Sequence, residues 1–152
     1  MNNKNNTNIN DFFEVFKAKI SYKYKNPIYS ETIQAGFPSP ASDYIEQRLD
    51  LNDFLIKHPS ATFFVKAKGD SMIDAGIHDG DILIVDKALE PKNNSIIIAV
   101  INSEFTVKRF RKIKDDYYLI PENINYKAIK LTEDMDFMVW GVVTNVIHEL
   151  GG

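Results

Sequence analysis

Short apolar runs alternate with turn-forming residues from Ala61 to Ile147, and this pattern constrains the fold more than any other feature of the chain. Runs rich in Val, Ile, Phe and Tyr between such turns are typical of β-strands. Asn102-Ser103 and Asp115-Asp116 are candidates for two-residue turns that join hairpins. The predicted strands are Ala61–Ala67, Asp81–Asp86, Ser95–Ile101, Glu104–Lys112, Tyr117–Ile120 and Phe137–Ile147. The expected fold class is mainly β, with a compact antiparallel body and few short helices.

The segment before this body has a different composition. Six of the first ten residues are Asn, and Asp11 then precedes a helical pattern of Phe12, Phe13, Val15, Phe16 and Ile20. Alternation from Ile20 to Lys25 predicts a short strand, and Gly36-Phe37-Pro38-Ser39-Pro40 predicts an extended linker. A brief capped helix is expected over Asp50–Lys57, ended by His58-Pro59. We therefore expect a flexible N-terminal arm ahead of the β body.

Composition excludes several classes of protein. The 152 residues contain no cysteine, so disulfides, thiol nucleophiles and Cys-based metal sites are excluded. No apolar run approaches the ~20 residues that cross a bilayer, and the Asn-rich start is unlike a signal peptide. Residues 1–35 carry five Lys and three acidic side chains, whereas the remainder carries 13 basic and 18 acidic ones. Because the body is acidic, direct DNA binding is not expected. The sequence predicts a cytoplasmic protein that does not bind membranes.

Ser71 and Lys108 are the candidate catalytic residues. Ser71 follows Gly69-Asp70, where a tight bend can expose a hydroxyl and leave the backbone N–H groups of Asp70 and Ser71 free to hold an oxyanion. Lys108 lies in an apolar segment, where burial would lower its pKa and allow it to act as a base. By strand alternation, Lys108 shares a face with Thr106 and Phe110. A turn-forming serine and a solvent-facing lysine remain the simpler interpretation of each residue alone.

Several short motifs between residues 35 and 143 occur together. They are Ala35-Gly36-Phe37-Pro38-Ser39-Pro40-Ala41, Asp43-Tyr44-Ile45-Glu46-Gln47-Arg48, His58-Pro59-Ser60-Ala61-Thr62, Gly69-Asp70-Ser71-Met72, Asp79-Gly80-Asp81-Ile82-Leu83-Ile84-Val85, Phe105-Thr106-Val107-Lys108-Arg109 and Val139-Trp140-Gly141-Val142-Val143. In this combination the chain resembles the LexA and UmuD family of self-cleaving Ser-Lys peptidases, and its UmuD branch more closely. The resemblance covers roughly residues 34–148.

The resemblance implies a function for each motif. Ser71 would be the nucleophile and Lys108 the general base, and both would act on the Ala35-Gly36 bond. Cleavage would remove an arm of residues 1–35 and leave a mature domain of residues 36–152. The family's activator is a RecA filament on single-stranded DNA. The trimmed protein of the family forms a homodimer that joins a UmuC-like Y-family polymerase in error-prone translesion synthesis during the SOS response.

Other functions fit the sequence less well. His58, His78 and His148 are scattered along the sequence without helical metal-ligand spacing, and the acidic residues near Gly76 and Gly80 do not match a calcium loop, so no metal and no cofactor are expected. A signal peptidase would need a membrane anchor, and a LexA-like regulator would need a helix-turn-helix before the cleavage site. A non-cleaving structural adaptor of the same fold is the remaining alternative.

Overall fold

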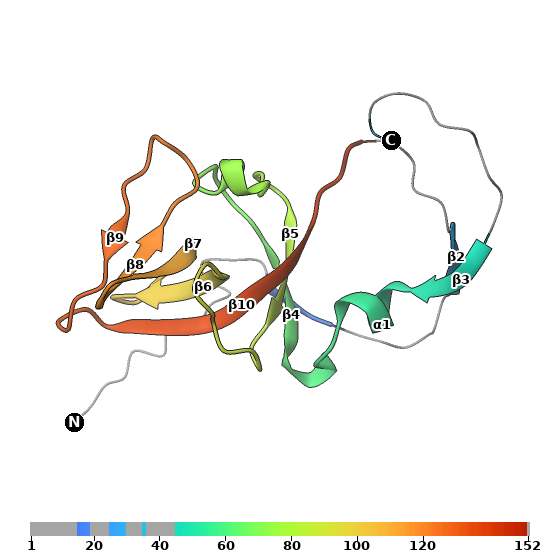
Figure 1. Ribbon diagram of the computed structural model, residues 1–152, viewed down its shortest axis with the longest axis horizontal. Helices are drawn as coiled ribbons and strands as arrows, with labels where there is room; N and C mark the ends of the chain where they lie inside the picture. The colour runs from blue at the N-terminus through green and yellow to red at the C-terminus, as the bar shows by residue number, and fades with distance from the viewer. Residues whose placement is uncertain (1–14, 19–24, 30–34, 36–44, 152) are drawn as a thin grey trace.

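Antiparallel β-strands make up most of the regular secondary structure in the computed structural model, which describes residues 15–18, 25–29, 35 and 45–151 (Figure 1). The main sheet has eight strands in the order β1-β4-β5-β10-β6-β7-β8-β9, and every pairing is antiparallel. This confirms the predicted fold class. The strands are β1 (Val15–Lys17), β4 (Thr62–Lys66), β5 (Ile82–Asp86), β6 (Ile96–Ile101), β7 (Glu104–Ile113), β8 (Asp116–Ile120), β9 (Ile129–Lys130) and β10 (Phe137–Ile147).

The long strand β10 joins the two halves of the sheet. Its first half pairs with β6 and its second half with β5, with a register shift in each pairing. Such bulges bend a strand and increase its twist, which lets one strand serve two differently oriented neighbours. In Figure 1 β10 accordingly runs across the whole body, from the β6–β9 side to the β4–β5 side.

The core lies on both faces of the sheet. Ile98 on β6 packs into a cluster with the β4, β5 and Ser71 segments, whereas its neighbours Ile97 and Ala99 pack into a second cluster with Leu119 and Val142. Since successive side chains of a strand point to opposite faces, β6 is buried on both sides. The first cluster comprises Val65, Ala67, Met72, Ile77, Leu83, Val85 and Ile98. It is the cluster that supports the candidate site.

The two predicted hairpin turns have different outcomes. Asn102 and Ser103 have φ of 47° and 69° and join β6 to β7, so this prediction is confirmed. Between β7 and β8 the turn residues are Lys114 and Asp115, because Asp116 already pairs with Ile113. The predicted Asp115-Asp116 turn is therefore wrong by one residue. The ladder register, which a buried face specifies strongly, decides where the turn falls.

The N-terminal segment also departs from the prediction. Val15–Lys17, part of the predicted helix, forms β1 and pairs with β4 in the register Val15↔Val65. Without β1, β4 would present an unpaired edge, and pairing with it outweighs the local helical pattern. Ala18, which follows β1, is not helical either, and the other residues of that predicted helix, including Asp11 and Ile20, lie outside the described residues. So does the predicted strand from Ile20, except for Lys25, the first residue of β2.

A second, two-stranded sheet precedes the body. It consists of β2 (Lys25–Tyr29) and β3 (Ile45–Asp50), which pair antiparallel. Helix α1 (Leu51–Leu55) follows, with the Asp50 side chain accepting a 2.9 Å hydrogen bond from the Asn52 N–H. The predicted capped helix is thereby confirmed, although it ends at Leu55 rather than at Lys57. The predicted linker at residues 36–40 lies outside the described residues, but the strands on either side of it are partners.

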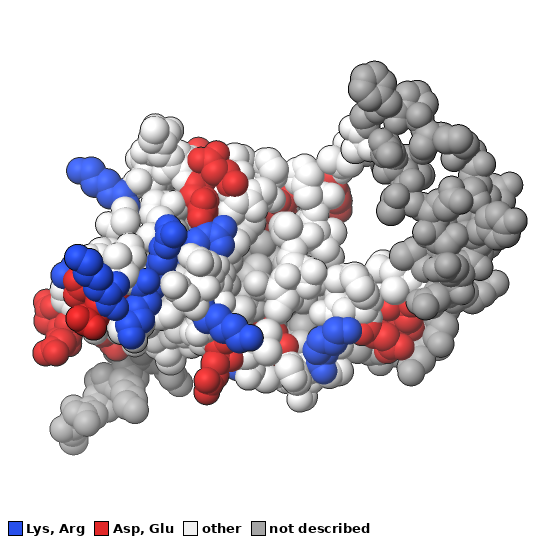
Figure 2. Space-filling view, viewed as in Figure 1, with Lys and Arg blue, Asp and Glu red and all other residues white. Residues whose placement is uncertain are grey.

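Charged side chains of both signs lie interspersed on the visible face of the molecule, mainly at the end formed by β7, β8 and β9 (Figure 2). One ion pair at this end joins Lys130 to Asp116, with Nζ and Oδ2 2.9 Å apart. Within the described ranges, no helix has the length and apolar character needed to cross a bilayer.

Candidate active site

Ser71 lies on a bend that follows β4. Gly69 has φ of 86°, a conformation that only glycine adopts without strain, and its N–H donates a 2.6 Å hydrogen bond to Asp79 Oδ1. The residue after Ser71, Met72, is buried in the first cluster, and the Ser71 carbonyl accepts a 2.9 Å bond from the Glu122 N–H. The position of the serine is therefore fixed by the hydrogen bonds of the Gly69 N–H and the Ser71 carbonyl and by the packing of Met72.

Lys108 lies on β7 and points its amine at Ser71. Only 8% of Lys108 is exposed, and its Nζ lies 3.1 Å from Ser71 Oγ. The same Nζ lies 2.7 Å from Thr106 Oγ1 and 2.9 Å from the Val107 carbonyl oxygen. The contact with Thr106 agrees with the face predicted by strand alternation. The structure thus brings together two residues that are 37 positions apart in the sequence.

Burial changes the acid–base behaviour of Lys108. Removal of the amine from water lowers the pKa of Lys108 below its ordinary value of 10.5. Among the described residues, no carboxylate forms an ion pair with this amine that would restore the charged form. A neutral lysine beside a serine hydroxyl is the pairing that base-assisted nucleophilic attack requires.

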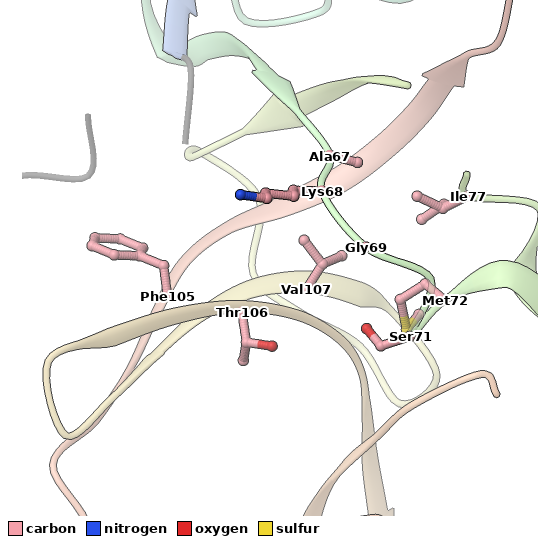
Figure 3. Close-up of a pocket in the computed structure, with 9 residues that line it drawn as sticks. All are labelled: Ala67, Lys68, Gly69, Ser71, Met72, Ile77, Phe105, Thr106 and Val107. Carbon is pink, nitrogen blue, oxygen red and sulfur yellow. The ribbon is translucent and has the colours of Figure 1, made fainter. Parts of the chain in front are cut away.

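A cavity of about 210 Å³ opens beside this pair. One wall is the chain leaving β4 and the other is the first half of β7 (Figure 3). The figure shows the Ser71 and Thr106 hydroxyls turned toward each other, and the Lys108 amine bonds to both. The lining residues are Ala67, Lys68, Gly69, Ser71, Met72, Ile77, Phe105, Thr106 and Val107. The lining therefore combines apolar side chains with the hydroxyls of Ser71 and Thr106.

Of the two predicted oxyanion donors, Ser71 lines this cavity and Asp70 directly precedes Ser71 in the chain. Within the described part of the chain, the N–H groups of Asp70 and Ser71 donate to no other group. Asp70 is held from the β8–β9 connection, since its carbonyl accepts a 2.9 Å bond from Asn123 Nδ2 and its Oδ1 accepts a 2.6 Å bond from the Tyr126 hydroxyl. The bend is thus fixed while its N–H groups stay available.

Several supporting residues were not assigned a role from the sequence. Thr106 could have been found, because alternation places it on the same strand face as Lys108. Asn123 and Tyr126 follow β8 and lie more than 50 positions from Asp70, and no local pattern marks them. Only the tertiary structure places them against the bend.

Ala35, the first residue of the predicted cleavage bond, does not line the cavity. Ala35 is an exposed bend residue and is not among the residues that line the cavity, while Gly36 lies outside the described residues. The structure therefore assembles Ser71, Lys108 and the two N–H groups, but it does not bring Ala35 to them.

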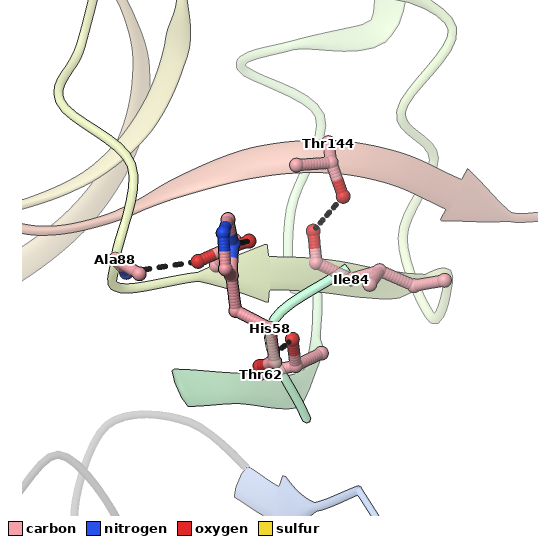
Figure 4. A network of polar contacts seen from close by, with 6 residues as sticks. His58, Thr62, Ile84, Ala88 and Thr144 are labelled. Atoms are coloured by element: carbon pink, nitrogen blue, oxygen red, sulfur yellow. Dashed lines mark hydrogen bonds and ion pairs between the residues drawn. The ribbon is translucent and has the colours of Figure 1, made fainter. Parts of the chain in front are cut away.

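The histidines are less scattered than the sequence suggests. His58 is exposed in a turn, as predicted, and its Nδ1 lies 2.6 Å from Asp86 Oδ2 in the network shown in Figure 4. His78 and His148, in contrast, lie together, with ring centroids 4.5 Å apart. Their spacing in the sequence does not indicate this proximity, which arises because the β5–β10 pairing brings their segments side by side.

Comparison with known proteins identifies relatives of the whole body. The model of the family Peptidase S24-like matches residues 27–144. Protein SamA of Salmonella typhimurium is 47% identical over 123 residues, which cover 81% of this chain and 85% of SamA. Protein MucA of Escherichia coli is 41% identical over 140 residues, covering 91% and 94% of the two chains. A LexA repressor of a Polaromonas species is 38% identical over 116 residues, covering 76% of this chain and 49% of the repressor.

Proposed function

The chain belongs to the Peptidase S24-like family, and we propose that it is a serine endopeptidase that cuts its own Ala35-Gly36 bond. The observation that carries this proposal is the 3.1 Å contact between Ser71 Oγ and the amine of a lysine that is only 8% exposed. Burying a lysine costs free energy, and here the amine is directed at a serine rather than at a carboxylate. A lysine with only a structural role could remain exposed to solvent and would not carry this cost of burial.

The chemistry follows from the three contacts of the Lys108 amine. In its neutral form the nitrogen accepts the Ser71 hydroxyl proton, while its two N–H groups donate to Thr106 Oγ1 and the Val107 carbonyl. Ser71 Oγ attacks the Ala35 carbonyl carbon, and the resulting oxyanion accepts bonds from the Asp70 and Ser71 N–H groups. The protonated amine then gives its proton to the departing Gly36 nitrogen. Water, activated by the same amine, hydrolyses the acyl-enzyme and restores Ser71.

Cleavage would allow the arm, residues 1–35, to separate from the rest of the protein. Residues 1–35 contribute β1, which pairs with β4 of the body over three residue pairs, and β2, which pairs with β3 in the separate two-stranded sheet over five. Such short pairings are marginal once the covalent connection is cut. We propose that the arm, residues 1–35, then leaves the mature domain, residues 36–152, and uncovers the edge of β4. Since Ala35 lies away from the cavity, the bond must be delivered by movement of its own loop or by a second copy of the chain.

The proposed setting is the bacterial SOS response in the cytoplasm. The resemblance to the UmuD branch supports RecA filaments on single-stranded DNA as the activator. It also supports a homodimer of the trimmed chain as accessory subunit of an error-prone, UmuC-like Y-family polymerase. The acidic body, net −5 from 13 basic and 18 acidic side chains, agrees with a protein that reaches DNA through partners rather than directly.

Intact-mass measurement of the purified chain over time tests the proposal. We expect conversion to a fragment of residues 36–152 that accelerates as pH rises and Lys108 loses its proton. Ser71→Ala should abolish the fragment, and Lys108→Ala should slow its formation by at least about a hundredfold, the contribution of a general base. Ser60→Ala and Lys112→Ala, exposed residues of the same types, are the matched controls.

Two results would contradict the proposal. Equal cleavage in the wild type and in both active-site variants would rule out self-processing by this pair. Absence of cleavage in the wild type, with or without RecA filaments on single-stranded DNA, would favour the non-cleaving adaptor.

A further inference from the structure

A second polar cluster lies at the end of the β5–β10 ladder. Asp81 directly precedes β5 and His148 directly follows β10, and the pairing Ile147↔Ile82 places them side by side. His78 lies three residues before Asp81, in the turn that leads into β5. None of these residues takes part in the proposed peptidase chemistry.

The donor atoms of the three side chains converge. Nitrogen or oxygen atoms from His78, Asp81 and His148 all lie within 4.8 Å of one another. His148 Nδ1 is 2.6 Å from Asp81 Oδ1, and His78 Nδ1 is 3.6 Å from Asp81 Oδ2. The two imidazole rings face each other at 4.5 Å with a tilt of 34°.

One buried polar atom of this cluster lacks a hydrogen-bond partner. Among the described residues, His78 Nδ1 is buried and has no hydrogen-bond partner. Buried polar atoms are nearly always paired, so an orphaned imidazole nitrogen aimed at a carboxylate needs an explanation. The Asp81 side chain is only 3% exposed, and its Oδ2 accepts a 2.7 Å bond from the His78 backbone N–H, which fixes the carboxylate.

We propose that His78, Asp81 and His148 bind one divalent transition-metal ion, with Zn²⁺ the best match and solvent in the fourth position. Two imidazole nitrogens and one carboxylate oxygen form a typical three-ligand zinc set. Neighbouring ligand atoms around tetrahedral zinc lie about 3.3–3.5 Å apart at ordinary bond lengths. His78 Nδ1 lies 3.6 Å from Asp81 Oδ2, which is close to this value, whereas His148 Nδ1 lies 2.6 Å from the other carboxylate oxygen, Oδ1. The ion would take one of these oxygens, and small side-chain rotations have to bring the three ligand atoms, which lie within 4.8 Å of one another, to the zinc spacing. Ca²⁺ and Mg²⁺ prefer oxygen ligands and are disfavoured.

The cluster is accessible and is connected to the rest of the fold. The side chains of His78 and His148 are 44% and 40% exposed, so an ion can enter from solvent. The Asp81 carbonyl accepts a 2.8 Å bond from the Ala67 N–H, in the segment between β4 and Ser71. A bound ion would therefore fasten the end of β10 to the turn before β5, next to the segment that carries the nucleophile.

Metal titration of the full-length chain without an affinity tag tests this proposal. The probes are Zn²⁺ followed by calorimetry and Co²⁺ followed by its visible absorption, which is intense for tetrahedral coordination. We expect one ion per chain. His78→Ala and His148→Ala should each weaken binding by at least about tenfold, because even outer-shell changes at metal sites have effects of that size.

His58→Ala is the matched control, since His58 also contacts a buried aspartate but has no second histidine beside it. Its affinity should equal that of the wild type. Metal-free thermal melts verify that each variant is folded, and His78→Gln replaces His78→Ala if the latter is unstable. The proposal is overturned if the wild type binds neither ion at millimolar concentration, or if both histidine variants bind as tightly as the His58 variant.

Discussion

Gly141 lies at the bulge in the β10–β6 pairing, and it leaves no room for a side chain. A Cβ atom at this position would lie 2.5 Å from Val85 Cγ1, about 1 Å closer than an ordinary contact between carbon atoms. Val85 is fully buried and β-branched, so it has little rotamer freedom to move away. Gly141→Ala must then displace β10 from β5 or push Val85 into the core. Such overpacking costs about 1–3 kcal/mol.

Urea and thermal unfolding measure this cost, with Ser71→Ala present in every protein so that the chain stays intact. For a chain of this size, the loss corresponds to a melting temperature lower by about 2–12 °C. Val85→Ala removes the clashing methyl group and creates a cavity with its own cost. In that background Gly141→Ala should cost less than about 0.5 kcal/mol, so the double-mutant cycle should show a coupling of about 1–3 kcal/mol.

The reasoning is refuted if Gly141→Ala costs the same in the presence and absence of the Val85 side chain. It is also refuted if the single substitution changes the stability by less than about 0.5 kcal/mol, the range of ordinary surface changes. Val85 shares a core cluster with Met72, the residue after the nucleophile. In the Ser71-containing chain, we therefore expect Gly141→Ala to slow self-cleavage as well.

Two further predictions follow from Lys108 and from the arm. Because burial lowers the pKa of Lys108 below 10.5, the unfolded chain binds more protons than the folded chain between the folded pKa and 10.5, and this residue's contribution to stability rises with pH across that window. Unfolding titrations at several pH values should show the stability of Lys108→Met relative to the parent chain falling as pH rises, and a difference independent of pH would contradict the argument. After cleavage, hydrogen exchange should accelerate at the β4 amides that face β1, and unchanged protection would mean that the arm stays bound.

Local patterns predicted much of the body because its strands are short, apolar and separated by strong turn residues. All six predicted strands from residue 61 onward form, and β10 has the predicted bounds, Phe137–Ile147. The segments that were mispredicted depend on partners elsewhere in the chain. Val15–Lys17 has a helical pattern but pairs with β4, and the turn after β7 is shifted by the register of a buried ladder.

The candidate active site and the His78–Asp81–His148 cluster likewise differ in how much depends on local sequence and how much on long-range contacts. The candidate pair of Ser71 and Lys108 could be predicted from the sequence, because a bend at Gly69 and an apolar strand are local properties and the family motifs connect the two residues. The burial of the amine, its bond to Thr106 and the absence of Ala35 from the cavity lining depend on long-range packing, which no local pattern reveals. The cluster of His78, Asp81 and His148 has no local signature at all. It exists because antiparallel pairing brings the start of β5 to the end of β10, so residues 67 positions apart become neighbours.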